Sequence, residues 1–236
     1  MTDLKGRIHS FQSLGAVDGP GIRYVIFLQG CPYKCPYCHN PDTKAFSGGE
    51  LYSVDELVER VCRYKPYFGS NGGVTVSGGE PLMQKEFVAE LFSQLHARGI
   101  NTALDTAGVK PDKMVEKVLE NTDTVLCDIK FPTDAQYQQY VGQSLETVKE
   151  FLSLCVNCGC DVIVRHVVVP GLTDSEESIY AIKALANEVK SLNKVELLPF
   201  RKLCVEKYKS LGIPFPLADV PECSEETIEK LRKLLD

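Results

Sequence analysis

The sequence predicts an α/β fold, a single-domain partial (β/α)6 barrel that is open on one side. Six short apolar runs rich in β-branched residues alternate with longer amphipathic segments. Strands that alternate with helices pair in parallel. Six such units are fewer than the eight that close a standard barrel. We therefore expect a curved sheet with a wide lateral mouth.

Each strand is expected at one of the apolar runs, which span residues 24–29, 74–77, 101–105, 124–130, 161–169 and 194–198. Helices are expected where apolar residues recur at helical spacing. These segments span residues 53–64, 85–98, 111–120, 144–157, 175–191 and 224–235. Because single α/β domains of this length are common, we expect one domain over residues 1–236, with a core at about 16–200 and a C-terminal helical extension at about 201–236.

Composition and charge exclude several classes of protein. The chain has 26 Lys and Arg against 32 Asp and Glu, so it lacks the basic footprint of a nucleic-acid binder. No apolar run approaches the roughly 18 residues of a membrane span, and residues 1–6 contain no apolar signal core. We expect a soluble, cytoplasmic protein whose ten cysteines are metal ligands or buried thiols, because disulfides are rare in that compartment.

Three of the cysteines, Cys31, Cys35 and Cys38, lie in one short loop after the first predicted strand. A structural zinc site has four ligands, and a conventional iron–sulfur cluster is held by four cysteines. Three thiolates therefore suggest a metal centre with one open coordination position. The alternative is a zinc site with His39 as the fourth ligand, although His39 directly follows Cys38 and simultaneous ligation by both is geometrically awkward.

A distinctive motif follows each of the six predicted strands. In a parallel barrel the loops at the carboxyl ends of the strands converge on a common mouth, so we expect these motifs to form one site. The motifs are the cysteine loop, Gly78-Gly79-Glu80-Pro81, Asp105-Thr106, Asp128-Ile129-Lys130, Pro170-Gly171 and Pro199-Phe200-Arg201.

Simpler interpretations exist for several of these residues. Gly78 to Pro81 could be a turn with proline at the start of a helix. Asp105, Asp128 and Lys130 could be a structural ion pair with helix caps. Tyr37 could be a loop aromatic packed on the core. A second cysteine group, Cys155, Cys158 and Cys160, is interpreted as buried inert thiols, because two lie on neighbouring helical turns and the third begins a strand.

The cysteine spacing, followed by a strand that ends in Gly78-Gly79-Glu80, resembles the radical S-adenosylmethionine (radical SAM) family. This resemblance implies a [4Fe–4S] cluster held by Cys31, Cys35 and Cys38, with S-adenosylmethionine bound at the open iron. It also implies that electron transfer from the cluster breaks a carbon–sulfur bond and gives a 5′-deoxyadenosyl radical. In such enzymes the cofactors carry the difficult chemistry and the protein positions them.

The resemblance also assigns roles to residues around the cluster. Lys130 would pair with the methionine carboxylate, a sound match of charges. The other implied cofactor contacts are Tyr37 at the adenine, Cys38 and His39 in the cluster loop, Gly78, Gly79 and Glu80 at the methionine amino group, and Asp128 and Ile129 beside Lys130. Asp105, Thr106 and Asp128 would hold a monovalent cation.

Longer runs resemble the branch of this family that activates pyruvate formate-lyase. They include GRIHSF at residues 6–11, VDGPGIR at 17–23, RHVVVPG at 165–171 and VELLPF at 195–200. The implied reaction removes an α-hydrogen from a backbone glycine of pyruvate formate-lyase, with flavodoxin or ferredoxin as the electron donor. Asp18 and Arg165 would hold the glycine loop, or else form an ordinary ion pair. The alternatives are activation of a different glycyl-radical enzyme and a zinc-stabilised interaction module without catalysis.

One departure from that branch lies after the sixth strand. The family usually has Tyr-His there, and the histidine touches the cofactor, whereas this chain has Phe200-Arg201. Arginine is not a conservative replacement for an imidazole. Either Arg201 supplies a different cofactor contact, or the cofactor is held elsewhere. Cys204 replaces an expected glycine, while the following Lys207 and Tyr208 fit the pattern.

Overall fold

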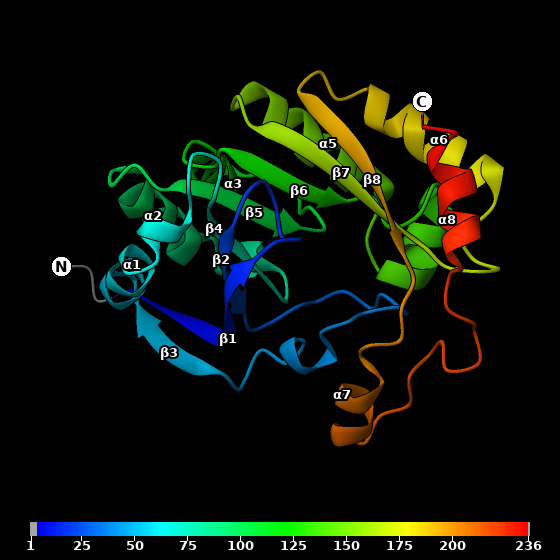
Figure 1. Cartoon of the computed structure of the whole chain (residues 1–236), viewed down its shortest axis with the longest axis horizontal. Coiled ribbons are helices and arrows are strands. Elements are labelled where there is room, and N and C mark those ends of the chain that lie inside the picture. The colour runs from blue at the N-terminus through cyan, green and yellow to red at the C-terminus, as the bar shows by residue number, and fades with distance from the viewer. Residues whose placement is uncertain (1–3, 236) are drawn as a thin grey trace.

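The computed structural model describes residues 4–235 and places their strands in one open sheet of order β3-β1-β2-β4-β5-β6-β7-β8 (Figure 1). The six strands β2, β4, β5, β6, β7 and β8 are parallel, and each pairs with the next one in this order. Helices separate them along the chain, so the predicted partial barrel of six βα units is confirmed. Two further strands, β1 and β3, extend the sheet in the antiparallel sense.

The strands are β1 Lys5–Gly15, β2 Arg23–Leu28, β3 Glu50–Ser53, β4 Gly73–Gly78, β5 Asn101–Thr106, β6 Thr124–Asp128, β7 Asp161–Val168 and β8 Leu192–Pro199. All six predicted strands are present, whereas β1 and β3 were not predicted. Only Gly6, Ile8 and Gly15 of β1 are buried, and none of β3 is, so neither strand has the apolar run of an interior strand. The sheet therefore begins at Lys5, before the core expected from residue 16.

The helices are α1 Val54–Cys62, α2 Lys85–His96, α3 Lys113–Leu119, α4 Asp134–Gln136, α5 Leu145–Asn157, α6 Glu176–Asn187, α7 Val205–Ser210 and α8 Glu225–Arg232. Short turns of other helix types are η1 Pro41–Thr43, η2 Lys65–Tyr67, η3 Pro81–Gln84 and η4 Tyr137–Val141. All six predicted helices are present. Four of them begin one residue after a capping serine, as at Ser53, whose hydroxyl accepts a hydrogen bond from the Glu56 amide. In residues 4–235 no helix is long and apolar enough to cross a membrane.

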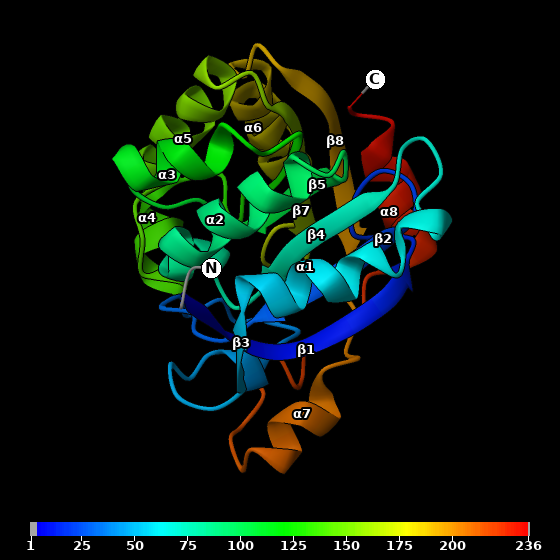
Figure 2. The same cartoon turned by 90° about the vertical axis from the view of Figure 1, so that its left-hand side faces the viewer.

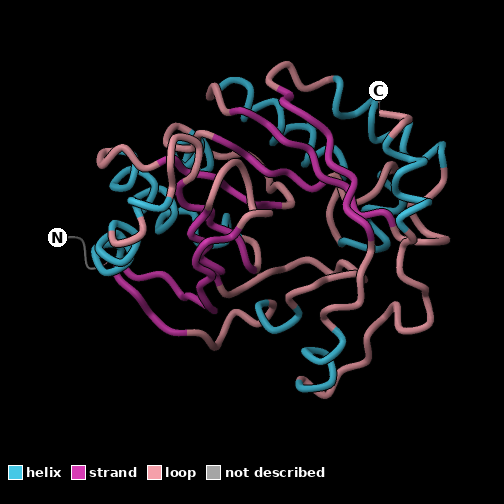
Figure 3. The backbone as a smooth tube through the Cα atoms, viewed as in Figure 1, coloured by secondary structure: helices cyan, strands magenta, loops and turns pink. Residues whose placement is uncertain are grey.

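The main core lies between the outer face of the sheet and the helices. Figure 2 shows α2, α3, α5 and α6 ranged outside the curved strands, and Figure 3 shows the same arrangement of helix around strand. Alternate residues of β2, such as Tyr24 and Ile26, pack into this core beside Phe92 of α2. The other residues of each strand face the concave side, where polar side chains such as Thr75 and Arg165 lie. The apolar core thus lies on the convex face of the sheet, and the concave face carries polar side chains that could form a site.

Arg23, the first residue of β2, closes the concave side at the amino ends of the strands. Its side chain is completely buried. Its Nε donates to Thr75 Oγ1 at 3.0 Å and its Nη1 to Asn101 Oδ1 at 2.7 Å, and the Val74 and Pro20 carbonyls accept further bonds. Burial lowers the pKa of this guanidinium to about 10. Arg23 therefore joins the starts of β2, β4 and β5 through hydrogen bonds to neutral groups.

We expect Arg23→Met to lower the free energy of unfolding by about 3 kcal/mol, because it leaves several buried acceptors without a donor. Urea unfolding followed by circular dichroism measures this change. Arg63→Met, at an exposed position after α1, is the matched control and should leave the midpoint unchanged. Equal midpoints for the two variants would contradict a structural role for Arg23.

Candidate active site

A cavity of about 280 Å³ lies at the carboxyl ends of the parallel strands. The loop after β2 and the ends of β4, β5, β6, β7 and β8 all contribute to its wall. The predicted site residues that line it are Cys31, Cys35, Tyr37, Cys38, His39, Gly78, Gly79, Glu80, Asp105, Thr106, Asp128, Lys130 and Arg165. Pro170, Gly171, Phe200 and Arg201 do not line it; Val167, Leu198 and Pro199 take their places at the ends of β7 and β8.

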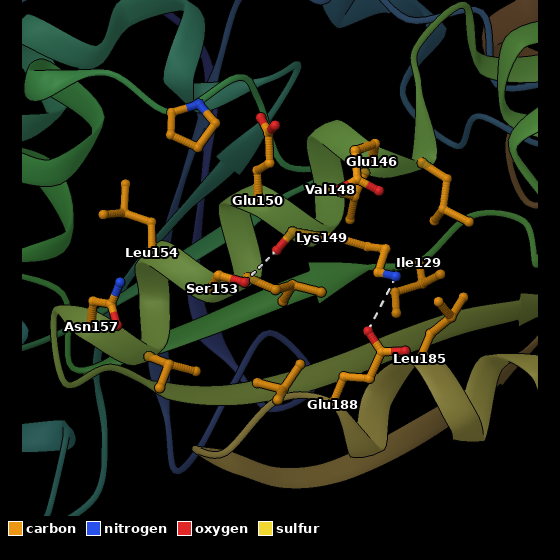
Figure 4. Close-up of a pocket in the computed structure, with 15 residues that line it drawn as sticks. Ile129, Glu146, Val148, Lys149, Glu150, Ser153, Leu154, Asn157, Leu185 and Glu188 are labelled. Carbon is orange, nitrogen blue, oxygen red and sulfur yellow. Dashed lines mark hydrogen bonds and ion pairs between the residues drawn. The ribbon is translucent and has the colours of Figure 1, made fainter.

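A larger cavity of about 450 Å³ lies outside the barrel, along α5 (Figure 4). Its wall is largely apolar, and the Lys149 ammonium lies 3.2 Å from the Glu188 carboxylate at its rim. Of the predicted site residues only Ile129 borders it. The Ile129 side chain therefore belongs to the outer core, and its neighbours Asp128 and Lys130 face the inner cavity.

The cysteine loop is held closed by backbone hydrogen bonds across its base. The Gly30 amide donates to the Thr43 carbonyl at 2.7 Å, and the Cys31 amide donates to the Lys44 carbonyl at 3.1 Å. The side-chain amide of Gln29 bridges the loop by donating to the Asp42 and Ala45 carbonyls. These bonds bring three partly exposed, unpaired thiols to one wall of the cavity.

The three thiols fit an iron–sulfur cluster. Burial raises the pKa of Cys31 to about 12 and also raises that of Cys35, so these thiols need a nearby positive charge to ionise. Bound iron supplies that charge. In residues 4–235 no three His, Cys, Asp or Glu side chains are placed to hold one metal ion. A cluster does not require such convergence, because its cysteines bind different iron atoms.

Gly78 and Gly79 bring the end of β4 directly against the cysteine loop. The Gly79 amide donates to the Leu28 carbonyl at 2.9 Å, and the Glu80 amide donates to the Gly30 carbonyl at 2.8 Å. A Cβ atom on Gly79 would lie 2.3 Å from the Gly30 oxygen, and one on Gly78 would lie 2.4 Å from the Leu28 nitrogen. Gly78 also has φ +109°, which favours glycine. Both glycines are therefore required for this contact between backbones.

The Glu80 carboxylate, a predicted cofactor contact, bonds to the protein itself. It accepts from Thr106 Oγ1 at 2.6 Å, from the Ala107 amide at 2.9 Å and from the Leu82 amide at 3.1 Å. Burial raises the pKa of this carboxyl to about 7. Glu80 thus fixes the end of β4 to the end of β5 and uses the hydroxyl of Thr106 to do so.

Two carboxylates and two cationic groups form a network on the cavity wall. Arg165 lies between Asp105, which its Nη2 contacts, and Asp128, whose Oδ1 is 3.1 Å from its Nε. The Lys130 ammonium lies 2.6 Å from Asp128 Oδ2, and Ser77 Oγ donates to Asp105 Oδ2 at 2.6 Å. Burial opposes the charged form of Asp128, but Arg165 and Lys130 outweigh it and lower the pKa of this carboxyl.

The network includes Asp105 and Asp128, two of the three predicted cation ligands. Both oxygens of Asp105 and both oxygens of Asp128 already have protein partners, and Thr106 donates to Glu80. The predicted cation ligands Asp105, Thr106 and Asp128 thus have partners within the protein, and a cation bound to them stays a prediction. The simpler interpretation of Asp128 and Lys130 as an ion pair describes their contacts.

Tyr37 and His39 of the cysteine loop both contact other parts of the protein. Tyr37 lines the cavity, donates its hydroxyl to the Lys130 carbonyl at 3.0 Å and packs near Phe131. His39 Nε2 lies 2.9 Å from the Arg201 carbonyl oxygen. The Arg201 guanidinium turns away and bonds to the Cys223 carbonyl and Glu225. The backbone of Arg201 reaches the cysteine loop, while its side chain does not line the cavity, which favours the alternative that a cofactor is held by other residues.

Asp18 lies close to the charge network although it does not line the cavity. Within residues 4–235 its Oδ2 atom is buried without a hydrogen-bond partner. Burial and the charge of Asp105 raise the pKa of this carboxyl, while Arg165 opposes the shift. Arg165 pairs with Asp105 and Asp128, so among residues 4–235 it does not form the alternative ion pair with Asp18.

Several lining residues were not predicted, namely Tyr33, Asn40, Thr43, Ser77, Ala107, Val167 and Leu198, whereas Pro199 belongs to the predicted motif after the sixth strand. Strand alternation could have identified Ser77, because it lies two residues after the inward-facing Thr75. Tyr33 donates its hydroxyl to the Gly108 carbonyl at 2.7 Å, a contact between distant segments that no local pattern indicates.

Comparisons with known proteins agree with this geometry. The family model of the Radical SAM superfamily matches residues 25–181. A pyruvate formate-lyase-activating enzyme of Clostridium pasteurianum is 44% identical over 233 residues, covering 98% of each chain. One of Staphylococcus aureus (strain USA300) is 41% identical and covers 96% of this chain and 93% of its own.

Solved structures share the fold at lower identity. A radical SAM methyltransferase from Sphaerobacter thermophilus has a TM-score of 0.65 at 17% identity, covering 90% of this chain and 63% of its own. A domain of a pyruvate-formate lyase-activating enzyme from Bacteroides vulgatus has a TM-score of 0.57 at 21% identity, covering 70% and 92%. With the cysteine loop, the strand-end cavity and these matches together, the chain belongs to the radical SAM superfamily.

Proposed function

We propose that this protein is the activating enzyme of a pyruvate formate-lyase and removes one hydrogen atom from a backbone glycine of that partner. The observation that carries the proposal is the cavity that Cys31, Cys35, Cys38 and Lys130 line together. Relatives that match nearly the whole chain bear the name of this activity. The three cysteines would hold a [4Fe–4S] cluster, and the same cavity would take S-adenosylmethionine.

When bound, these two groups supply an electron-triggered bond cleavage that delivers a 5′-deoxyadenosyl radical to the glycine. Lys130 would hold the methionine carboxylate. Burial opposes the charge of this lysine, but Asp128 and the neighbouring Cys35 raise its pKa well above the usual value, so it stays an ammonium. A buried ammonium with a side-chain exposure of 15% is well suited to a carboxylate ligand.

The glycine-bearing segment of the partner would enter beside Asp18 and Arg165. Once the chain that covers it moves aside, the Oδ2 of Asp18 could accept a backbone N–H of an incoming peptide, which would supply the hydrogen bond that it lacks among residues 4–235. Arg165 can donate to a peptide carbonyl from the same charge network. Glycine suits the reaction because its radical is stabilised by the flanking amide groups and has no side chain to obstruct approach. A flavodoxin or ferredoxin would supply the electron.

The direct test is anaerobic reconstitution with iron and sulfide, followed by reductant, S-adenosylmethionine and pyruvate formate-lyase. We expect a glycyl-radical doublet in the electron paramagnetic resonance spectrum and lyase activity that depends on the doublet. A fully loaded protein that cleaves S-adenosylmethionine but yields no doublet on this lyase would refute the choice of partner.

We expect Cys31→Ser, Cys35→Ser and Cys38→Ser each to lower cluster content and to abolish the doublet, because each removes one of the three thiolate ligands. Iron analysis and the visible absorbance of the reconstituted protein measure the cluster. Cys62→Ser, on the half-buried end of α1, is the matched control and should retain both. A Cys35→Ser protein with full iron content and activity would contradict this assignment.

We expect Lys130→Met to keep the cluster but to need about 10- to 100-fold more S-adenosylmethionine for half-maximal cleavage, since it removes a charge-assisted contact. Cleavage is followed by the formation of 5′-deoxyadenosine. Lys110→Met removes a lysine from an exposed position after β5 and should behave like the parent protein. An unchanged dependence on S-adenosylmethionine in Lys130→Met would place the carboxylate elsewhere.

A further inference from the structure

The segment from Phe200 to Cys223 forms a small lobe beside the barrel. In Figure 1 its helix α7 lies apart from the helices that cover the sheet. The lobe has its own core, in which the Phe215 ring lies 4.9 Å from the Tyr208 ring and 6.2 Å from the Phe200 ring, centre to centre. The Cys223 amide donates to the Phe200 carbonyl at 3.1 Å and closes the base of the lobe. The lobe is therefore a compact unit that starts and ends at the end of β8.

This lobe contacts the cysteine loop through two consecutive residues of α7. The Tyr208 hydroxyl donates to the carbonyl of Cys38, the third cysteine, at 3.3 Å. The Lys207 ammonium lies 2.8 Å from Asn40 Oδ1 and 3.2 Å from Asp42 Oδ1. These contacts join positions more than 160 residues apart in the sequence. Both side chains thus grip the stretch that follows the third cysteine.

These polar contacts are not needed to pack the core of the lobe. The Tyr208 ring already belongs to the lobe core, so its hydroxyl contributes only the bond to Cys38. Lys207 brings a positive charge to Asp42, whose other oxygen lies 3.3 Å from His9 Nε2. Groups around metal ligands orient those ligands and tune the metal, as do charge and hydrogen bonds around iron–sulfur clusters.

We propose that Lys207 and Tyr208 are positioning residues that clasp the cysteine loop, hold Cys38 in place for the cluster and keep the local charge favourable for reduction. The inference rests on the proposed function only in taking Cys31, Cys35 and Cys38 as cluster ligands. It does not depend on the partner or on cleavage of S-adenosylmethionine. Without the Lys207 ammonium, less of the negative charge of Asp42 is neutralised. The addition of an electron to the nearby cluster then becomes less favourable.

The test uses the reconstituted full-length protein without S-adenosylmethionine or lyase. Lys207→Met and Tyr208→Phe are each compared with the parent protein for the anaerobic rate at which a ferrous chelator removes iron. We expect about tenfold faster loss in both variants, the lower end of the effect that altered surroundings of metal ligands have. The midpoint potential of the Lys207→Met cluster should shift to more negative values, and Lys207→Arg should restore it.

The matched control is Lys209→Met, which removes a lysine of the same helix that is 67% exposed and, within residues 4–235, pairs with Glu206 alone. It should release iron and take up an electron like the parent protein. Urea unfolding of each apoprotein distinguishes a specific effect on the cysteine loop from a general loss of stability. The proposal is overturned if Lys207→Met keeps the parent potential, or if both variants lose iron only in proportion to lost stability. A lyase that acquires no glycyl radical would refute the proposed partner and leave these rates unaffected.

Discussion

Four charged side chains at the ends of three neighbouring strands determine the architecture of the site. Arg165 from β7 lies between Asp105 of β5 and Asp128 of β6, and Lys130 completes the network beside Asp128. Removing such charges from water is costly unless each has a partner. The parallel arrangement of β5, β6 and β7 supplies these partners, because it brings their carboxyl ends to one edge. The pairing register of β5, β6 and β7 therefore determines which charged side chains lie together on the cavity wall.

The cysteine loop depends on this frame through a second constraint, the absence of side chains at Gly78 and Gly79. The backbone of β4 approaches Leu28 and Gly30 so closely that a Cβ atom at either glycine would collide with it. Glu80 then extends the attachment to β5 by its bonds to Thr106 and Ala107. The cysteine loop is thus fixed to the same strand ends that carry the charges, and the cavity is built on rigid elements.

The sequence predicted the parts of the molecule that depend on local pattern. The buried parallel strands are apolar runs, and capping serines such as Ser53 mark where helices begin. The motifs that follow the predicted strands together identified most of the cavity wall. By contrast, β1 escaped prediction because most of its residues are at least partly exposed, and α7 is only six residues long.

What the sequence could not predict is the choice of partner for each polar group. Asp105, Thr106 and Asp128 offer oxygen atoms that suit a cation, and only the folded chain shows that Arg165, Lys130 and Glu80 engage them. Arg201 stands where the family has a cofactor-binding histidine, yet its guanidinium bonds to the C-terminal segment. Such long-range pairing depends on tertiary structure, which no local pattern records.

The position of Asp42 has a consequence for how the protein matures. One oxygen of this carboxylate faces His9 near the start of the chain, and the other faces Lys207 near its end. During synthesis the cysteines emerge early, but the residues that fasten the outer side of their loop emerge only when most of the chain has been made. On the proposal that Lys207 and Tyr208 hold the cysteine loop in place, the loop is fastened on its outer side only once residues 207 and 208 have been made and have folded back onto it.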